Sequence, residues 1–509
     1  MNLFKIKSFK TLNSRNIHLL KSLIVKYPSF TYLIIFTPLF FLNIRSDHDW
    51  GGDFAQYIEQ AKCFIQMKSM NNIGYIYNEY FPSLSPRVYP PFFSILISPI
   101  YLFYQLNMVP YNYLISFFLV VFGILIIHFL KNYFGFFKSI LIGILFIYNP
   151  FFLIFKSEIL ADIPFSVFFL MIIILFNTKK QEFKHWFLIG CLIGILCTIK
   201  SIGIVIFISL ILHSINIGFL DFKHHLNLKT TLNKIGPIYK SIFTGCIVIL
   251  FINLIAFHEI KISSGYEKTF QSVESIYLTF NENVFYYSEL IKNFFNNYEG
   301  SELWITNLLG SGILIFFIVG FLNSFTKESN LLNWITIVYF MTLFVYPYKN
   351  SGFRFLIPVI PLILFYISKS IRLISTNKIN LIVFYFTVFF TLLQYRKQLI
   401  TIQQSTKIIQ EGPYKNEVRY AFKEINRITT RNSVIVFKKP SVLSLYTNRK
   451  SFCNSQNCTA EDLETQFTIH KPTHFLIYDK LNDTSLVNYI NEKKLKIIWR
   501  NKDFKLFKS

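Results

Sequence analysis

Long apolar runs dominate this chain of 509 residues and limit what it can fold into. A helix that crosses a bilayer needs about 20 mostly apolar residues, with a range of roughly 17–25. Stretches near this length without Asp, Glu, Lys or Arg recur along the first 395 residues; they cover 27–44, 88–130, 139–155, 163–178, 185–199, 201–220, 241–258, 303–326, 329–348, 355–368 and 379–395. Only 15% of the residues are charged, against about 25% in an ordinary soluble protein. The pattern predicts an all-α polytopic membrane protein.

The run at 88–130 is too long for one helix and contains four prolines, which are Pro90, Pro91, Pro99 and Pro110. We expect one span over about 108–130, preceded by a short re-entrant or surface helix over 92–107. Cytoplasmic loops of membrane proteins collect Lys and Arg. With the N-terminus inside, the predicted cytoplasmic pieces hold 19 Lys and Arg and only three acids, and a crossing at 92–107 would invert this bias. The sequence therefore predicts about 11 transmembrane helices, with the C-terminal part outside the cytoplasm.

The net charge of +24 does not indicate a nucleic-acid partner, because the positive residues lie between apolar runs. Residues 1–26 are basic, contain no acid and show no signal-peptide cleavage pattern. We interpret them as a cytoplasmic tail that leads into a retained first span. Together these features predict a multi-pass protein of a bacterial cytoplasmic (inner) membrane.

The composition changes after the last apolar run, so we divide the chain into a transmembrane domain over 1–395 and a soluble domain over 396–509. An amphipathic piece at 418–428 is followed by short apolar, β-branched pieces at 433–437, 474–478 and 495–499. This alternation predicts a small extracytoplasmic α/β domain. Cys453 and Cys458 lie close together in it, and both a disulfide and two free thiols are open for them.

Three aspartates, Asp47, Asp49 and Asp53, lie within seven residues in the first predicted extracytoplasmic loop, which covers 45–87. The stretch from Asp53 onward has the pattern of a helix, with Asp53 near its N-terminus. An aspartate there is a good helix cap, but a cap needs one carboxylate and not three. The cluster is therefore a candidate for chemistry.

A second pair of acids, Glu158 and Asp162, lies at the edge between two predicted spans. A spacing of four places both on one face if the segment is helical. Ionisable groups at this depth are costly to bury, which makes them candidates for function. The alternative is a capping pair wetted by the interface, since Pro164 suits a first helical turn.

Two cations lie near the ends of later apolar runs. Lys200 interrupts one stretch, at the expected end of a tight helical hairpin, and Arg354 precedes another. A snorkelling lysine and an interfacial arginine are the rival interpretations. A carboxylate that accepts a proton from a hydroxyl, with cations that hold a departing phosphate, would suit group transfer from a lipid-linked phosphate. The sequence has no Walker A loop, no His-Glu-x-x-His pair and no Gly-x-Ser-x-Gly elbow.

Five short elements occur in a recognisable order between about residues 45 and 365. They are Asp53-Phe-Ala-Gln-Tyr57 with Ala61, then Tyr89-Pro-Pro-Phe92, then Glu158 to Asp162 with Pro164, then Thr198-Ile-Lys200 with Gly203, and Arg354-Phe-Leu-Ile-Pro358. In this order they resemble the GT-C superfamily of integral membrane glycosyltransferases, closest to the protein O-mannosyltransferase and aminoarabinose transferase branch. The chain departs from that pattern at Phe54, where a second acid is usual, and at Phe355, where tyrosine is usual.

The resemblance implies a sugar donor carried on a polyprenyl phosphate, an inverting transfer and an extracytoplasmic site. It makes Asp53 the carboxylate that activates an acceptor in a glycan, lipid or protein, with Asp47 or Asp49 as supporting acids. Lys200 and Arg354, with Arg87, become candidates for binding the donor phosphate. Some members use a divalent metal near the second acidic element, which here is Glu158 and Asp162. A further loop over 259–302 would cover the site, and the C-terminal domain would recognise the acceptor.

Three rival functions remain open from the sequence. A transporter or flippase of lipid-linked saccharides would place functional groups near the bilayer midplane and show symmetry between halves. A polysaccharide polymerase or ligase would have a different fold, and a noncatalytic scaffold would not need several acids in one loop. The transferase interpretation requires Asp53, Asp162, Lys200 and Arg354 to converge on one outward cavity.

Overall fold

The computed structural model describes residue 26 and residues 28–178, 182–223, 228–258, 273–293, 304–327, 330–347, 349–374, 377–455, 458–481 and 483–509. The chain divides into two compact units, Met1–Leu42 and Asn43–Ser509. In the first, helix α2 (Pro28–Phe36) continues into the 3-10 helix η1 (Thr37–Phe40). Nearly all of the predicted N-terminal tail lies outside the described residues.

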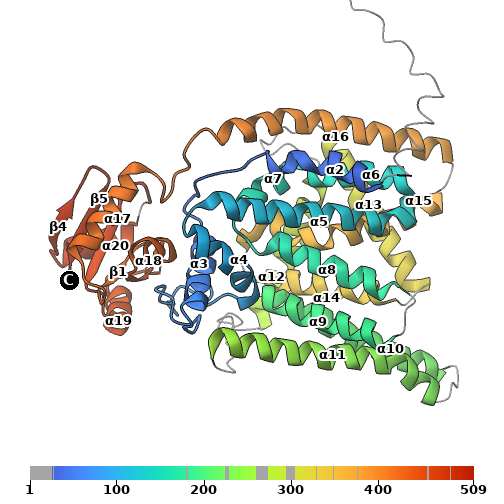
Figure 1. The fold of residues 1–509 in the computed structure, drawn as a ribbon, viewed down its shortest axis with the longest axis horizontal. Helices are drawn as coiled ribbons and strands as arrows, with labels where there is room; N and C mark the ends of the chain where they lie inside the picture. The colour runs from blue at the N-terminus through green and yellow to red at the C-terminus, as the bar shows by residue number, and fades with distance from the viewer. Residues whose placement is uncertain are drawn as a thin grey trace, which may run out of the picture. The chain divides into compact units, whose positions relative to one another are not determined.

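Helices make up the first part of the second unit (Figure 1). They are α3 (Gly52–Ile65), α4 (Pro91–Tyr104), α5 (Met108–Phe134), α6 (Phe136–Ile147), α7 (Pro150–Ser157), α8 (Asp162–Phe176), α9 (Phe183–Ile199), η2 (Ser201–Gly203), α10 (Ile204–Lys223), α11 (Leu228–Phe257), α12 (Val273–Lys292), α13 (Trp304–Lys327), α14 (Leu331–Val345), η4 (Lys349–Phe355), η5 (Ile357–Val359), α15 (Ile360–Ile374) and α16 (Asn377–Ser405). Helices α5, α8, α9 and α11 pack side by side in that order (Figure 1). Helix α12 lies inside the predicted covering loop, and the flanks of that loop, 259–272 and 294–302, are outside the described ranges.

Four of the described helices are long and apolar enough to cross a membrane, or up to five if the bent pair α6 and α7 is one span. Large apolar side chains remain exposed on them; on α11, Phe243 is 69% and Phe251 is 62% exposed. Such surfaces are unfavourable in water and suit a lipid environment. The predicted membrane protein is thus confirmed at this level, whereas the count of 11 spans and the sides of the loops stay predictions.

Two breaks shape the helical part. The run at 88–130 forms the separate helices α4 and α5, as the sequence predicts, and the break falls at Gln105, whose φ of 47° cannot continue a helix. The run at 139–155 forms α6 and α7, which are bent by 54°. Asn149 caps α7 by accepting from the Phe151 N–H, and Pro150 follows as the first helical residue.

The C-terminal part has the predicted α/β character. Its elements are α17 (Asn416–Ile428), β1 (Val434–Val436), α18 (Pro440–Thr447), β2 (Lys450–Phe452), α19 (Ala460–His470), β3 (His474–Tyr478), η6 (Asp479–Leu481), α20 (Thr484–Glu492), β4 (Lys496–Arg500) and β5 (Phe504–Lys508). The sheet order is β2-β1-β3-β5-β4; β1 is parallel to β2 and β3, and β5 is antiparallel to β3 and β4. Its core includes Val436, Phe452, Phe475 and Leu486.

The first loop also joins this sheet. The Ile76 N–H donates to the Ser451 carbonyl and the Ser451 N–H donates to the Gly74 carbonyl, which extends the β2 edge. Helix α16 continues through residue 395 to Ser405. The division into domains at 395/396 stays a prediction. Cys453 and Cys458 are both free thiols here.

Candidate active site

Asp53 lies in the first turn of α3, as the sequence predicts. It does not cap the helix, because the N-cap position is Gly51 and no side chain caps there. Its Oδ1 accepts a hydrogen bond from the Tyr89 hydroxyl at 2.7 Å, and its Oδ2 pairs with Arg354 Nη2 at 2.9 Å. The side chain is 26% exposed. Asp53 is therefore held by two side chains and still reachable.

Arg354 bridges two carboxylates. Its Nε and Nη2 each lie 3.3 Å from Asp162 Oδ2, while Nη2 also binds Asp53. It belongs to η4, where Gly352 takes a φ of 55° that favours glycine and kinks the segment. The planar guanidinium fork suits this double role, which a lysine cannot fill.

Asp162 and Lys200 complete the network. Asp162, the first residue of α8, is 2% exposed, and its Oδ1 lies 2.7 Å from Lys200 Nζ. Lys200 ends α9 in an extended conformation, and Gly203 allows the tight turn because a Cβ there would lie 2.8 Å from the Cys197 backbone. Lys200 Nζ also lies 4.7 Å from the centre of the Phe355 ring. The aromatic residue that replaces the usual tyrosine thus packs against a cation of the network.

A continuous series of contacts links five side chains, those of Tyr89, Asp53, Arg354, Asp162 and Lys200. We call these five residues the Asp53 network. It contains two negative and two positive charges, so it is neutral overall. The four charged residues that the transferase interpretation names thus lie together, while their opening to one outward cavity stays a prediction.

Tyr89 is the residue that sequence reasoning missed. It was noted only as the start of the Tyr-Pro-Pro-Phe element and received no role. Its ring stacks on Tyr57 at 4.5 Å, and Tyr57 packs edge-on against Phe93 at 4.8 Å. Burial raises the pKa of the Tyr89 hydroxyl well above its usual value, so it donates as a neutral phenol. The position of Tyr89 directly before Pro90 and Pro91 was the available signal.

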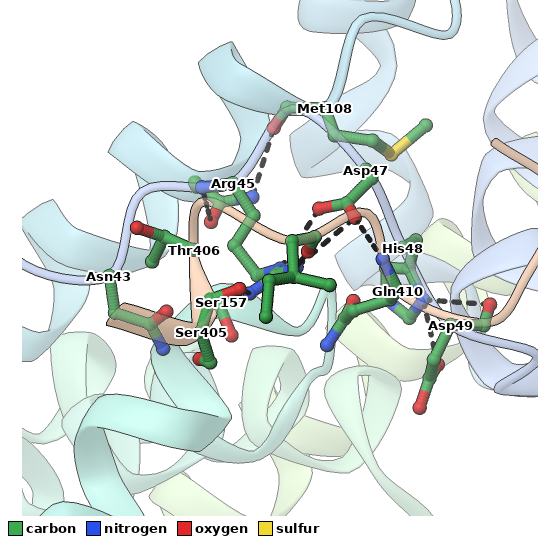
Figure 2. A network of polar contacts seen from close by, with 12 residues as sticks. Asn43, Arg45, Asp47, His48, Asp49, Met108, Ser157, Ser405, Thr406 and Gln410 are labelled. Carbon is green, nitrogen blue, oxygen red and sulfur yellow. Dashed lines mark hydrogen bonds and ion pairs between the residues drawn. The ribbon is translucent and has the colours of Figure 1, made fainter. Parts of the chain in front are cut away.

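Asp47 belongs to a different cluster (Figure 2). Arg45 Nε and Nη2 lie 2.9 and 3.1 Å from its two oxygens, and the Gln410 N–H donates to Oδ2 at 2.5 Å. Arg45 also donates to the carbonyls of Ser405 and Ile408. This cluster, the Arg45–Asp47 clamp, ties the first loop to the end of α16 and the segment that follows it, and it shares no residue with the contacts of Asp53.

Asp49 lies between these two sites. Its Oδ1 accepts from the Gly51 N–H at 2.8 Å and lies 3.0 Å from His48 Nδ1, and its side chain is 50% exposed. Burial opposes ionisation, but the contacts with His48 and Gly51 outweigh it and lower the pKa of Asp49. The His48 ring stacks on Phe54 at 3.7 Å. Phe54, which replaces the usual second acid, is thus a fully buried packing residue.

The remaining predicted site residues are less directly placed. Glu158 ends α7 and Asp162 begins α8, so the segment is not one helix and the condition for a shared helical face is not fulfilled. The extended backbone at Glu158, with a ψ of 140°, separates the two residues. Burial, reinforced by Asp49, raises the pKa of Glu158 to about 7. Arg87 has an exposed side chain, and only its carbonyl contacts α3, by accepting from Gln56.

The acids do not fit a divalent metal. Lys200 and Arg354 already occupy the two oxygens of Asp162. Among the residues that the structure describes, no group of three His, Cys, Asp or Glu side chains is arranged to hold a metal ion. Such a cation needs several oxygen ligands, which these acids do not offer together.

Two solved enzymes share this architecture over most of their length. Residues covering 94% of this chain match 97% of ArnT from Cupriavidus metallidurans, solved with undecaprenyl phosphate, at a TM-score of 0.56 and 11% identity. The Archaeoglobus fulgidus oligosaccharyltransferase AglB, solved with an inhibitory peptide and a dolichol-phosphate, matches 89% of this chain and 70% of its own at a TM-score of 0.51 and 10% identity. The chain has the GT-C fold.

The GT-C fold confirms the architecture predicted from the five ordered elements. At 10–11% identity the likeness is one of fold alone. No protein-family model and no curated protein sequence matches the chain. The function must therefore be argued from the residues that the GT-C fold brings together.

Proposed function

We propose that this protein is a membrane glycosyltransferase that moves one sugar from a polyprenyl-phosphate carrier to an acceptor on a glycan, lipid or protein. The observation that carries the proposal is the Asp53 network. Its members come from the starts of α3 and α8, the end of α9, the approach to α4 and the 3-10 helix before α15. A GT-C fold that gathers a carboxylate and two cations from these distant segments has the parts that such a transfer needs.

In the proposed reaction, Asp53 accepts the proton of an acceptor hydroxyl. The acceptor oxygen forms a bond to the anomeric carbon of the sugar on the face opposite the phosphate, and the bond from that carbon to the phosphate oxygen breaks. The configuration at the anomeric carbon is inverted. The polyprenyl phosphate leaves with the electron pair of the broken bond.

Lys200 and Arg354 would stabilise the charge that grows on the departing phosphate. At rest both cations bind Asp162, and Arg354 also binds Asp53. The donor phosphate would share these cations with the two carboxylates. Asp162 then has a positioning role, because it holds the lysine and the arginine side by side. Glu158, Asp49 and Arg87 would contact the sugar or phosphate at the edges of the site.

A lipid-linked donor also suits where the network lies. Asp162, Lys200 and Arg354 all lie at helix ends, next to apolar helices such as α8 and α9. A lipid tail can pack between those helices while its phosphate reaches the helix ends. A transporter is expected to keep its charged groups near the middle of broken helices, so this placement supports the transferase over the flippase.

The finer topology belongs to the same proposal. We infer about 11 spans in a bacterial inner membrane, with the N-terminus in the cytoplasm and the first loop, α12 and the C-terminal α/β domain outside it. The support is the excess of Lys and Arg in the opposite loops. Cysteine-accessibility labelling at Thr459, in the C-terminal domain, would test the side.

The decisive test uses membranes that contain the full chain and a labelled polyprenyl-phosphate sugar. Asp53→Asn should lower transfer by about 100- to 10,000-fold, the usual effect of losing a general base. Asp221→Asn is a matched control, because Asp221 is also ion-paired but ends α10, about 30 Å along that helix from Lys200. Undiminished transfer by Asp53→Asn would remove Asp53 from the mechanism. Glycan and lipid profiling of a deletion strain would identify the acceptor class.

A further inference from the structure

The C-terminal domain places a lysine beside the Asp53 network. Lys439 follows β1 and occupies the N-cap position of α18. Strand β1 lies between β2 and β3, all three parallel, and the chain leaves β1 toward β2 but leaves β3 toward β5 and β4. The connections therefore diverge at the carboxyl ends of β1 and β3. This is the place where open parallel sheets bind ligands.

The first loop inserts a tryptophan at that edge of the sheet. Trp50 lies 5.9 Å from Phe437, which follows β1, and 5.5 Å from Tyr478, the last residue of β3. It is 7% exposed, and its Nε1 has no hydrogen-bond partner among the described residues. Since Trp50 is three residues before Asp53, this contact brings the carboxyl edge of the sheet to the site.

Helix pairing locates Lys439 more closely. Glu59 of α3 accepts from the Ser444 hydroxyl of α18, and Lys62 of α3 contacts Asn448 just after α18. Both contacts move toward the C-terminal end in α3 and in α18, so the two helices run parallel. The two helices lie next to each other (Figure 1). Their N-terminal ends are therefore neighbours. Lys439 at the start of α18 lies beside Asp53 at the start of α3.

The charges around Lys439 agree with this placement. Burial lowers the pKa of the Lys439 ammonium group, and the nearby carboxylates of Asp49 and Asp53 oppose this shift. The Lys439 carbonyl accepts from the Leu443 N–H, but its ammonium group makes no hydrogen bond or ion pair with the residues that the structure describes. Its neighbour Lys438, in contrast, donates to the Leu481 carbonyl at 2.5 Å. Lys439 thus keeps its donors for a ligand.

We propose that Lys439 binds an anionic group of the acceptor, so that the acceptor carries a phosphate or carboxylate near the hydroxyl that receives the sugar. The inference rests on the proposed function. The donor phosphate is assigned to Lys200 and Arg354 of the helical part, where Lys200 pairs with Asp162 and Arg354 also pairs with Asp53. Lys439 reaches it from the C-terminal domain, where a soluble group approaches. A charge-assisted bond from an ammonium to such an anion is one of the stronger contacts available.

The test measures binding separately from transfer. The full-length protein in detergent is titrated with glucose 6-phosphate, and with glucose as the uncharged probe, while its unfolding temperature is followed. We compare wild type with Lys439→Met, Lys439→Arg and the matched control Lys438→Met. Glucose 6-phosphate, but not glucose, should stabilise wild type, Lys439→Arg and Lys438→Met. In Lys439→Met the concentration for half of the effect should rise at least about tenfold.

The assignment would be overturned, even if transfer is observed, by either of two results. One is that glucose 6-phosphate stabilises wild type and Lys439→Met equally, and the other is that Lys438→Met loses this stabilisation as much as Lys439→Met does. Transfer from the labelled donor, measured on the same preparations, should fall in Lys439→Met through a higher KM for acceptor with the rate of donor hydrolysis unchanged. Lys439-dependent binding without any transfer by wild type would refute the transferase, and with it the claim that this anion is an acceptor.

Discussion

The Arg45–Asp47 clamp and the Asp53 network both start in the first loop, yet they are built differently. In the clamp, the side chains of Arg45 and Asp47 are 3% and 8% exposed, and apart from each other these side chains bond to backbone groups at Ser405, Ile408 and Gln410. In the Asp53 network every partner is a side chain, and Asp53 and Arg354 are about a quarter exposed. Asp47 and Asp53, two aspartates only six positions apart, therefore lie in opposite environments.

The difference teaches how to separate a structural ion pair from a functional one. A backbone carbonyl or amide is held in place by the fold. A clamp closed by backbone groups therefore fixes the chain and leaves no hydrogen-bonding group free for a ligand. Side chains can exchange partners as charge moves during a reaction. This contrast assigns Asp47, a predicted supporting acid, to holding the first loop, and it leaves Asp53 for chemistry.

The largest effect is expected for Asp47→Ala. Arg45 would remain buried without its carboxylate, which costs about 3–5 kcal/mol of folding free energy. Thermal unfolding in detergent should show the loss, while transfer per folded molecule should stay near the wild-type value. A variant as stable as wild type but inactive would break the comparison, because Asp47 would then act in the reaction.

Arg354→Lys tests the opposite member of the pair. The charge stays, but one ammonium cannot bridge Asp53 and Asp162 as the guanidinium fork does. Transfer should fall by about 100- to 1,000-fold, with a smaller loss of stability than Asp47→Ala shows. Arg45→Lys is the matched control, and it should lose more stability than activity. If Arg45→Lys lost mainly activity and Arg354→Lys lost mainly stability, our assignment would be contradicted.

Glu59 is a third acid of the loop, and it is expected to act through pH. It is 6% exposed beside Ser444, and burial raises its pKa from 4.5 to about 7. The folded protein thus holds this proton more tightly than the unfolded chain. Its stabilising effect is complete below pH 4.5 and is lost as the pH rises through 7. At about 1.4 kcal/mol per pKa unit, the loss is roughly 3 kcal/mol.

Glu59→Gln should remove this dependence. The stability of the variant relative to wild type, measured by thermal unfolding between pH 5 and pH 8, should increase with pH. Glu424→Gln is a suitable control, because Glu424 pairs with the exposed Arg427 on helix α17. Parallel curves for Glu59→Gln and wild type would show that Glu59 keeps its charge in the fold.

Tyr89→Phe is expected to have the smallest effect. It removes one hydrogen bond to Asp53 Oδ1, which is worth about 1 kcal/mol, and keeps the stacking on Tyr57. Transfer should fall about fivefold, with no change in unfolding temperature beyond a few degrees. A loss as large as that of Asp53→Asn would instead give Tyr89 a direct part in the reaction.

Local patterns carried much of the fold. The helix from Asp53, the amphipathic α17 and the strands β1, β3 and β4 follow from periodicity and β-branched residues. The strands β2 and β5 were missed, because Lys450–Phe452 is short and Phe504–Lys508 alternates with lysines. Asn149 and Pro150, which break the run at 139–155, are signals that apolar length alone does not weigh.

The four charged residues of the Asp53 network were found because they stand out against apolar surroundings and follow a known order. The partners that divide Asp47 from Asp53 lie far along the chain. Arg45 meets residues after α16, and Lys439 meets the first loop through helix pairing. Such contacts depend on tertiary packing, which no local spacing encodes. Between Glu158 and Asp162 the cause is local, because the backbone leaves the helix at Glu158, which a spacing of four residues does not reveal.

The neutrality of the Asp53 network has a consequence for selectivity. Asp53 and Asp162 act as built-in counter-ions, so any anion that approaches Lys200 and Arg354 must compete with carboxylates already in place. A free phosphate ion brings nothing further with which to compete. A phosphate joined to a long hydrocarbon chain brings the free energy of its tail among the apolar helices, at about 0.8 kcal/mol per buried CH₂ group. On the proposed function, Lys200 and Arg354 would therefore discriminate against soluble phosphates and favour those delivered by the membrane.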